Sequence, residues 1–164
     1  MSRIYTSRFS NKELKSGKYY TVGITLGRPK FRLGYVESEH CYMLAPDRSM
    51  WGKSREEFRT LYREKLDAIG EYKIKNLLRE IGNKAEGRDV VLLCYEDVRD
   101  PSQHCHRTTL AEWLGEKFGL KIEELDDPSP VKFKKAKASE TKKKIEDDSK
   151  SEQGFKQMSL FDFV

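Results

Sequence analysis

Three residues with reactive side chains follow one another near the middle of the chain: Cys105, His106 and Arg107. A thiol between imidazoles is a candidate nucleophile, because neighbouring positive charge lowers its pKa and favours the thiolate. The guanidinium of Arg107 is a planar fork that fits phosphate or carboxylate oxygens. Glu96 adds a carboxyl group that could act as a general acid or base. These residue types therefore predict anion recognition, thiol chemistry or both.

The neighbouring sequence predicts the elements that position these residues. Residues 90–93 form an unbroken apolar run rich in β-branched side chains, typical of a strand covered on both faces in a parallel sheet. Residues 108–118 carry an apolar stripe at helical spacing, formed by Leu110, Trp113, Leu114 and Phe118. The reactive residues thus lie between the carboxyl end of a strand and the amino end of a helix. Ligands bind at this edge of α/β sheets, and free N–H groups at a helix start attract anions.

Three interpretations of this segment are open. In the first, Arg107 and Thr108 bind an anion, such as a nucleotide phosphate, beside the first turn of the helix. In the second, Cys105, His106 and Glu96 form a catalytic group. The spacing from Cys105 to Arg107 is too short for the phosphate-binding loop of a cysteine phosphatase, so that reaction is disfavoured.

In the third interpretation the same residues are structural. Cys94 ends the buried strand as a small core residue, Arg107 pairs with Glu96 or Asp97, and Thr108 caps the helix. A metal site from His40, Cys41, His104, Cys105 and His106 is a minor alternative, because these residues do not show the sequence spacings of zinc sites. We therefore assign no metal ligands, and the cofactor stays open.

The central residues also carry a family resemblance. Leu-Leu-Cys-Tyr-Glu at 92–96, Cys-His-Arg at 105–107 and Ala-Glu-Trp-Leu at 111–114 resemble the signature of the domain-of-unknown-function 488 family, in particular its phage- and plasmid-associated branch. Three further segments agree in order and spacing: residues 5–7, 24–35 and 44–46. The resemblance extends over about residues 3–125. It implies a fold and a site and names no substrate.

One departure from the family's pattern lies in the loop after the second expected strand. Typical members have Asp-Val-Arg before a Pro, whereas this chain has residues 25–27 as Thr-Leu-Gly and places Arg28 next to the Pro. The Asp is missing, so a function that depends on its carboxylate would differ here. Arg28 is one of three cations in this loop, with Lys30 and Arg32. They predict either an anion-binding loop that faces the Cys-His-Arg segment or a solvated basic loop.

The remaining segments predict a small α/β domain. Strands are expected at residues 3–6, 19–26, 90–93 and 120–125, with a short extended piece at 42–46. Helices are expected at 54–69, about 71–81 and 108–118, the first with Ser54 and Glu57 as a capping box. This order predicts a small, mostly parallel sheet flanked by helices, followed by a disordered tail. We divide the chain into an α/β domain (1–127), a disordered Lys-rich linker (128–156) and a terminal peptide (157–164).

Charge and cysteine content limit the function classes. The net charge of +5 belongs mainly to the linker, so the nearly neutral domain gives weak support to a nucleic-acid-binding surface. Three cysteines without a recognisable signal peptide predict free thiols in a reducing, cytoplasmic setting. No apolar run approaches the ~18 residues that span a membrane, and no membrane partner is expected.

The end of the chain resembles a sliding-clamp-binding peptide. Its residues fit the bacterial form (Gln, an aliphatic residue, a small or acidic residue, Leu, Phe) with Gln157, Met158, Ser159, Leu160 and Phe161. The archaeal and eukaryotic form is matched by Gln157, Leu160 and Phe163, although Val164 replaces its second aromatic residue. In both forms Gln supplies a directional hydrogen bond and the apolar side chains fill a pocket. The alternatives are a fortuitous apolar terminus or a last strand docked on the domain's own sheet.

Together these features predict a DNA-transaction accessory protein of replication or repair. Its domain would offer a nucleotide- or phosphate-binding edge, and its partners would be a sliding clamp and DNA or nucleotides. Whether the domain is an enzyme stays open. Two hypotheses from other classes are a non-enzymatic adaptor or clamp competitor, and a small-molecule enzyme unrelated to DNA.

Overall fold

The computed structural model describes residues 2–134. Most of the predicted linker and the whole predicted clamp-binding peptide therefore lie outside the described residues. The strands are β1 (Ile4–Arg8), β2 (Tyr19–Gly23), β3 (Glu39–His40), β4 (Asp89–Cys94) and β5 (Glu123–Glu124). The α-helices are α1 (Arg55–Ile69), α2 (Glu71–Lys84) and α3 (His106–Phe118), and short 3-10 turns are η1 (Lys12–Ser16), η2 (Tyr42–Leu44) and η3 (Arg48–Met50).

The described strands form one sheet in the order β3-β2-β4-β1-β5. Every pair of neighbouring strands is parallel. The predicted α/β class is confirmed, and the sheet is parallel throughout where we expected it to be mostly so. β4 lies between β1 and β2, so the carboxyl end of β4 reaches the middle of one sheet edge.

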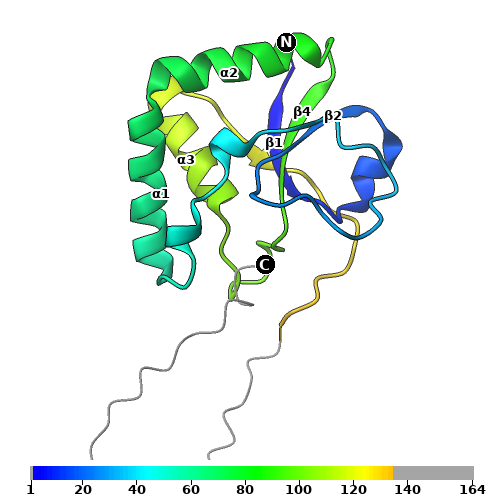
Figure 1. Cartoon of the computed structure of the whole chain (residues 1–164). Coiled ribbons are helices and arrows are strands. Elements are labelled where there is room, and N and C mark those ends of the chain that lie inside the picture. Colours follow the sequence, from blue (N-terminus) through cyan, green and yellow to red (C-terminus); the bar gives the residue numbers. More distant parts are fainter. Residues whose placement is uncertain (1, 135–164) are drawn as a thin grey trace, which may run out of the picture.

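Each face of the sheet has its own apolar core, because successive strand residues point to opposite faces. On β4, Val90 and Leu92 join the larger core with all three α-helices, whereas Val91 and Leu93 join a smaller core with Phe9 of the β1–η1 turn. Figure 1 shows α1, α2 and α3 on one side of the strands and the segment around η1 on the other. These four residues of β4 are each at most 2 % exposed, which confirms a strand covered on both faces.

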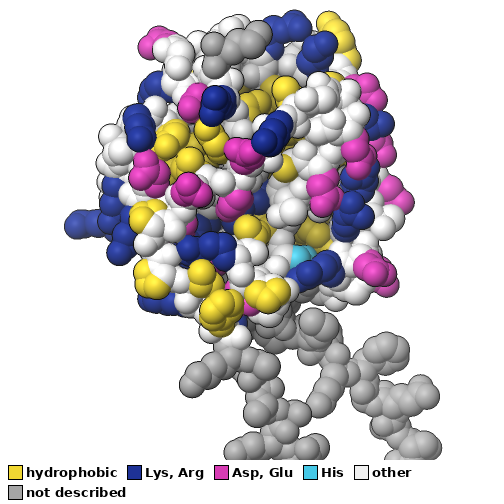
Figure 2. Space-filling view, turned by 180° about the vertical axis from the view of Figure 1, so that it is seen from behind, with side chains coloured by type: hydrophobic (Ala, Val, Ile, Leu, Met, Phe, Trp, Pro, Cys, Tyr) yellow, Lys and Arg dark blue, Asp and Glu magenta, His cyan; other side chains and the backbone are white. Residues whose placement is uncertain are grey.

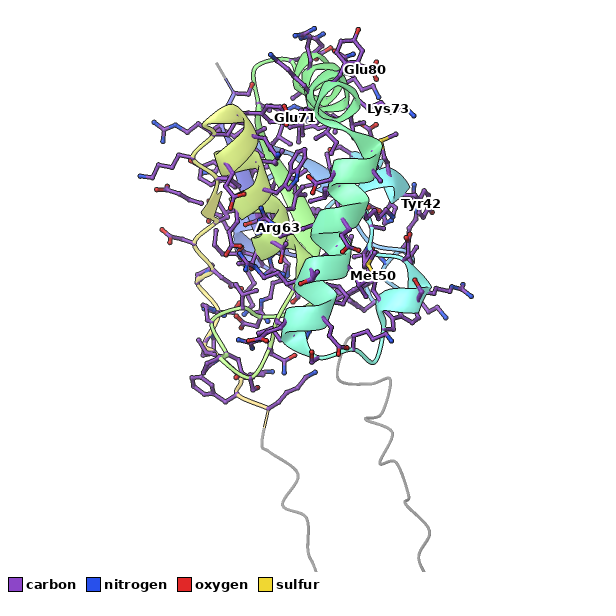
Figure 3. The ribbon with its side chains drawn as sticks, turned by 90° about the vertical axis from the view of Figure 1, so that its left-hand side faces the viewer. Tyr42, Met50, Arg63, Glu71, Lys73 and Glu80 are labelled. Atoms are coloured by element: carbon purple, nitrogen blue, oxygen red, sulfur yellow. The ribbon has the colours of Figure 1, made fainter. Side chains whose placement is uncertain are left out.

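The helices begin and pack as their sequences indicate. Ser54 caps α1, and its hydroxyl accepts a hydrogen bond from the backbone N–H of Glu57 at 3.2 Å. Figure 3 shows α1 beside α3, with Arg63 between them. Arg63 pairs with Glu116 of α3. One turn earlier on each helix, Arg59 lies 2.6 Å from Glu112, so two ion pairs at the surface link these helices.

Several predicted boundaries were wrong; for example, β2 ends at Gly23 and not at residue 26. α3 begins at His106 and not at Thr108, since Cys105 is its extended N-cap residue. The expected extended piece at 42–46 is the 3-10 turn η2, and the strand at this place is the two residues before it, β3. The last strand is limited to β5, whose two residues pair with β1 at the edge of the sheet and are exposed. An edge strand has only one neighbouring strand to pair with, so its pairing ends where the contact with that neighbour ends.

The segment after the predicted domain boundary is held on the domain up to residue 134. Arg99 donates to the carbonyl oxygen of Ser129 at 2.8 Å, and the backbone N–H of Lys134 donates to Asp100 at 2.9 Å. On the face shown in Figure 2, basic and acidic side chains are intermixed, in keeping with a nearly neutral domain. Within residues 2–134 no helix combines the length and the apolar character needed to cross a membrane.

Candidate functional site

A pocket of about 640 Å³ opens at the carboxyl edge of the sheet. Its lining includes Cys94, the last residue of β4, with Glu96 just beyond it, and Cys105 and His106 at the start of α3. The residues predicted as a catalytic group (Cys105, His106 and Glu96) therefore do converge in space. They meet because β4 and α3 are joined at this edge, as the chain order β4–loop–α3 requires.

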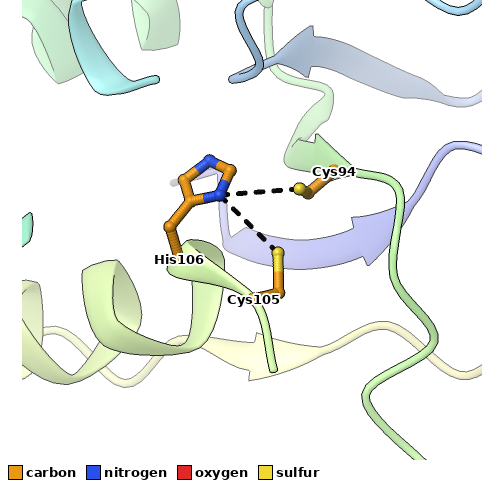
Figure 4. A group of neighbouring side chains, drawn as sticks. All are labelled: Cys94, Cys105 and His106. Atoms are coloured by element: carbon orange, nitrogen blue, oxygen red, sulfur yellow. Dashed lines mark hydrogen bonds between the residues drawn. The ribbon is translucent and has the colours of Figure 1, made fainter. Parts of the chain in front are cut away.

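The imidazole of His106 has a defined orientation. Its Nε2 lies 2.6 Å from the carbonyl oxygen of Ile24, just after β2. A carbonyl oxygen can only accept, so Nε2 carries the hydrogen, and the Nδ1 of a neutral ring is left as an acceptor. Nδ1 faces two thiols, with the Sγ of Cys94 at 3.6 Å and the Sγ of Cys105 at 3.7 Å. Figure 4 shows this arrangement.

The pKa values of the two thiols are shifted in opposite directions. Burial raises the pKa of the Cys94 thiol well above its ordinary value. Burial acts in the same sense on Cys105, but the hydrogen bond from Cys94 and the charge of Arg107 outweigh it, and the pKa of the Cys105 thiol falls well below its ordinary value. Cys105 is thus the thiolate of the pair, stabilised by the neighbouring thiol and by the guanidinium of Arg107.

Glu96 belongs to the same group. Its Oε2 lies 3.0 Å from the Sγ of Cys94. Burial and the negative charge of Cys105 raise the pKa of Glu96 to about 8. A carboxyl group with such a pKa holds its proton near neutral pH and can release it there, as a general acid or base requires. The pocket floor therefore combines a thiolate, an imidazole and a carboxyl group that can exchange a proton.

Arg107 lies away from the pocket. Its side chain is fully buried and forms a bidentate pair with Glu124, with Nη2 2.7 Å from Oε1 and Nε 3.2 Å from Oε2. The structural interpretation predicted that Arg107 pairs with Glu96 or Asp97. This was wrong, because the pairing residue is Glu124. Among the described residues none accepts a hydrogen bond from Nη1. Arg107 thus acts on the site through its charge, which lowers the pKa of Cys105.

Thr108 lines a second, smaller cavity of about 480 Å³ on the other side of the α3 start. Cys105 and His104 contribute to the lining of both cavities. Direct anion binding by Arg107 and Thr108 stays a prediction, since the structure places neither in the main pocket.

The basic loop after β2 does face the thiols. Arg28 and Lys30 line the main pocket, whereas the neighbouring Arg32 is exposed and does not. The Arg28 side chain is 60 % exposed and forms an ion pair with Glu37 across 3.6 Å, and such exposed pairs are weak. The rim of the pocket therefore carries two cations.

Sequence reasoning missed two groups of pocket residues. Cys94 was assigned to the core, although its place at the end of the central strand beside Glu96 was a usable signal. The aromatic side chains of Phe31, Trp51 and Phe58 also line the pocket. They come from three separated segments, and nothing in their local sequence indicates that they meet.

The fold and site define a class of protein: a parallel α/β domain with two thiols, an imidazole and a carboxyl group at its ligand-binding edge. A family model described as the "Active DUF488-N3 subclade" matches residues 39–118, from β3 to the end of α3. This match supports the domain-of-unknown-function 488 family and includes every thiol, imidazole and carboxyl group of the pocket floor. No curated protein and no solved structure matches the chain.

Proposed function

We propose that this chain is a DNA-transaction accessory protein whose domain binds and processes a phosphate-bearing, nucleotide-like ligand. The observation that carries the proposal is one pocket with two cations at its rim and reactive groups on its floor. Arg28 and Lys30 line the same pocket as Cys105 and His106. Cations above a thiolate and an acid–base pair suit an anionic substrate whose reacting atom reaches the floor.

The size and walls of the pocket fit such a ligand. Its volume of about 640 Å³ lies within the range of small-molecule sites, which run to roughly 1,000 Å³. Phe31, Trp51 and Phe58 provide aromatic surface on which a base can stack, an interaction worth about 1–3 kcal/mol in single-stranded nucleic-acid binding. The half-exposed Phe31, at 47 %, is the ring most open to a ligand.

The family match favours a working site over a purely adaptor role. The matching model is described as that of an active subclade. The matched residues include the thiol, imidazole and carboxyl groups of the pocket floor, which supports the proposal of a working site.

The second half of the proposal is the tether. Residues 157–164 resemble a sliding-clamp-binding peptide and lie outside the described residues, so this part rests on the sequence alone. A linker of this length reaches roughly 30 Å if it behaves as a flexible chain. Such a tether would keep the domain near DNA without fixing its orientation.

Ligand binding is tested with the full chain. A calorimetric titration of the protein with a deoxynucleoside monophosphate should show saturable binding. Arg28→Ala should weaken this affinity about tenfold, or ~1.4 kcal/mol. Arg32→Ala is the matched control, because it removes an equal charge from the same loop outside the pocket. Equal affinity in both variants, or no binding at all, would contradict the proposed ligand.

The tether is tested separately. A labelled peptide of residues 153–164 should bind purified bacterial or archaeal-type clamp with micromolar or tighter affinity. Gln157→Ala and Leu160→Ala should each abolish binding, since they remove the hydrogen-bonding anchor and an apolar side chain that fills the pocket. A peptide that binds neither clamp rules out the tether and leaves the pocket unaffected.

A further inference from the structure

Two thiols and an imidazole nitrogen lie within 4.8 Å of one another at the floor of the pocket: the Sγ atoms of Cys94 and Cys105 and the Nδ1 of His106. They belong to two elements, the end of β4 and the start of α3. We propose that Cys94, Cys105 and His106 bind a zinc ion. This site goes beyond the proposed function, because these three side chains can bind the metal without a nucleotide.

The distances suit the metal. Zinc binds thiolate sulfur at about 2.3 Å and imidazole nitrogen at about 2.0–2.1 Å in a tetrahedral arrangement, which sets sulfur and nitrogen about 3.6 Å apart. The observed separations from Nδ1 are 3.6 Å to Cys94 and 3.7 Å to Cys105. The same geometry sets the two sulfurs about 3.8 Å apart, and in the structure they lie within 4.8 Å of one another. The sulfurs therefore need to approach each other by at most about 1 Å.

The imidazole is already in the form that a metal requires. The hydrogen bond from Nε2 to the carbonyl oxygen of Ile24, at 2.6 Å, places the ring hydrogen on the far nitrogen. Nδ1 then presents its lone pair towards the two sulfurs. A backbone carbonyl that fixes the tautomer of a ligating histidine is the usual support of a zinc site.

The charges also balance. On binding, the Cys94 thiol releases its proton to solvent, whereas Cys105 is already a thiolate, and two thiolates with one neutral imidazole neutralise a divalent cation. Two sulfurs and one nitrogen select zinc over magnesium or calcium, which prefer oxygen ligands. The three residues are between 2 % and 6 % exposed, so the metal would be held away from bulk solvent and reached through the pocket.

Three protein ligands leave the fourth position of a tetrahedral ion open. All three ligands line the main pocket, so the open position faces it. A water molecule would occupy it, or a phosphate oxygen of the ligand; this last step rests on the proposed function. Zinc there would act as a Lewis acid on the bound oxygen.

Cys41 provides a matched control. It is a third buried cysteine, 7 % exposed, and burial raises the pKa of its thiol. Its neighbour His40 has both ring nitrogens close to other groups, with Nε2 2.6 Å from the carbonyl oxygen of Thr25 and Nδ1 2.6 Å from Glu37. Cys41 is therefore a thiol of similar burial without a free imidazole nitrogen to share a metal.

The experiment uses the purified full chain and no nucleotide. Metal analysis should find one zinc per chain, and the protein stripped with a chelator should take up one equivalent of Co²⁺ with thiolate-to-cobalt charge-transfer bands and tetrahedral d–d bands. Cys94→Ser, Cys105→Ser and His106→Gln should each weaken zinc by on the order of 100-fold or more. Cys41→Ser should bind as the unsubstituted chain does.

Folding and function are kept separate in this test. His106→Gln retains an N–H donor for Ile24, and circular dichroism of each variant identifies a loss that comes from misfolding. A stripped chain with full secondary structure that takes up no Co²⁺, and whose thiols react equally fast before and after chelation, overturns the zinc site in favour of a metal-free thiol–imidazole pair. Arg28→Ala should retain zinc, so failure of the nucleotide titration and failure of the metal titration are distinguishable.

Discussion

The imidazole of His106 donates to the carbonyl oxygen of Ile24 across 2.6 Å, and this bond joins the start of α3 to the end of β2. Directly beside it, the carbonyl oxygen of Thr25 lies 2.6 Å from Nε2 of His40, on β3. Two consecutive carbonyl groups beyond β2 are thus satisfied by imidazoles from two other elements. One histidine faces the thiols and the other does not, which makes them a natural pair for mutation.

Replacing either histidine by Ala should destabilise the domain to a similar extent. His106→Ala leaves the buried carbonyl of Ile24 unpaired, and His40→Ala does the same to Thr25, each at about 1–3 kcal/mol. Urea unfolding measures both free energies. Only His106→Ala should change the reactivity of Cys105 towards a thiol reagent, because only this ring contacts the thiols. A His40→Ala variant with altered Cys105 reactivity would show that the two histidines are coupled.

The buried pair of Arg107 and Glu124 gives a second prediction. Glu124→Gln removes the charge that neutralises a fully buried guanidinium, so we expect a loss of about 2 kcal/mol, below the 3–5 kcal/mol of a fully buried pair because the Glu124 side chain is 34 % exposed. Glu123→Gln is the control, since Glu123 pairs with the exposed Lys121. It should change the free energy of unfolding by less than about 0.5 kcal/mol. Equal effects from the two neighbouring variants would contradict the structural role of Arg107.

The strand β4, the helix α3 and Arg107 show which features could be predicted from the sequence and which could not. The apolar run at 90–93 and the stripe of α3 are local patterns, so the strand, the helix and the edge between them were predicted, although the helix begins two residues earlier than expected. The orientation of Arg107 was not predictable. Consecutive helical residues point about 100° apart, so a helix that begins at His106 directs Arg107 away from the pocket that His106 lines.

The pocket walls depend on strand order, which no local pattern carries. Arg28 faces Cys105 because β2 is the neighbour of β4 in the sheet. The same order brings Trp51 and Phe58 above the thiols from segments with no chemical signature of their own. Cys94 could have been identified: a cysteine at the end of a central parallel strand lies at the ligand-binding edge by position alone. Its apolar neighbours favoured a core assignment.

The close packing around Gly23 gives a third prediction. A Cβ atom at this residue would lie 2.5 Å from Nδ1 of His40 and closer still to Oε1 of Glu37. Gly23→Ala should therefore displace this buried pair and cost about 1–3 kcal/mol, as overpacking does. Gly27→Ala is the control, because its Cβ would meet no atom within 4 Å. Thermal unfolding of both variants provides the measurement, and an undisturbed Gly23→Ala variant would mean that β3 can move away from β2.

The ion pairs that hold residues 127–129 on the domain predict a dependence on acid. Asp127 lies 2.7 Å from Arg8 and accepts a hydrogen bond from the backbone N–H of Ser129 at 2.9 Å. Burial opposes ionisation of Asp127, but the Ser129 N–H and the Arg8 guanidinium outweigh it and lower the pKa of the carboxyl group. Asp97, which pairs with Arg99 at 2.8 Å, has a lowered pKa mainly because of that pair.

A carboxyl group whose pKa is lower in the folded state contributes stability above its unfolded pKa, about 3.9 for Asp. That contribution is lost as the pH falls from there through the folded value. Asp127→Asn should therefore cost about 1–2 kcal/mol at pH 7 and progressively less as the pH falls below about 4. Urea unfolding across this range measures the difference, with Asp126→Asn as the control because Asp126 is exposed. If the cost of Asp127→Asn were the same at low pH as at pH 7, the ionised carboxylate would not be what holds this segment.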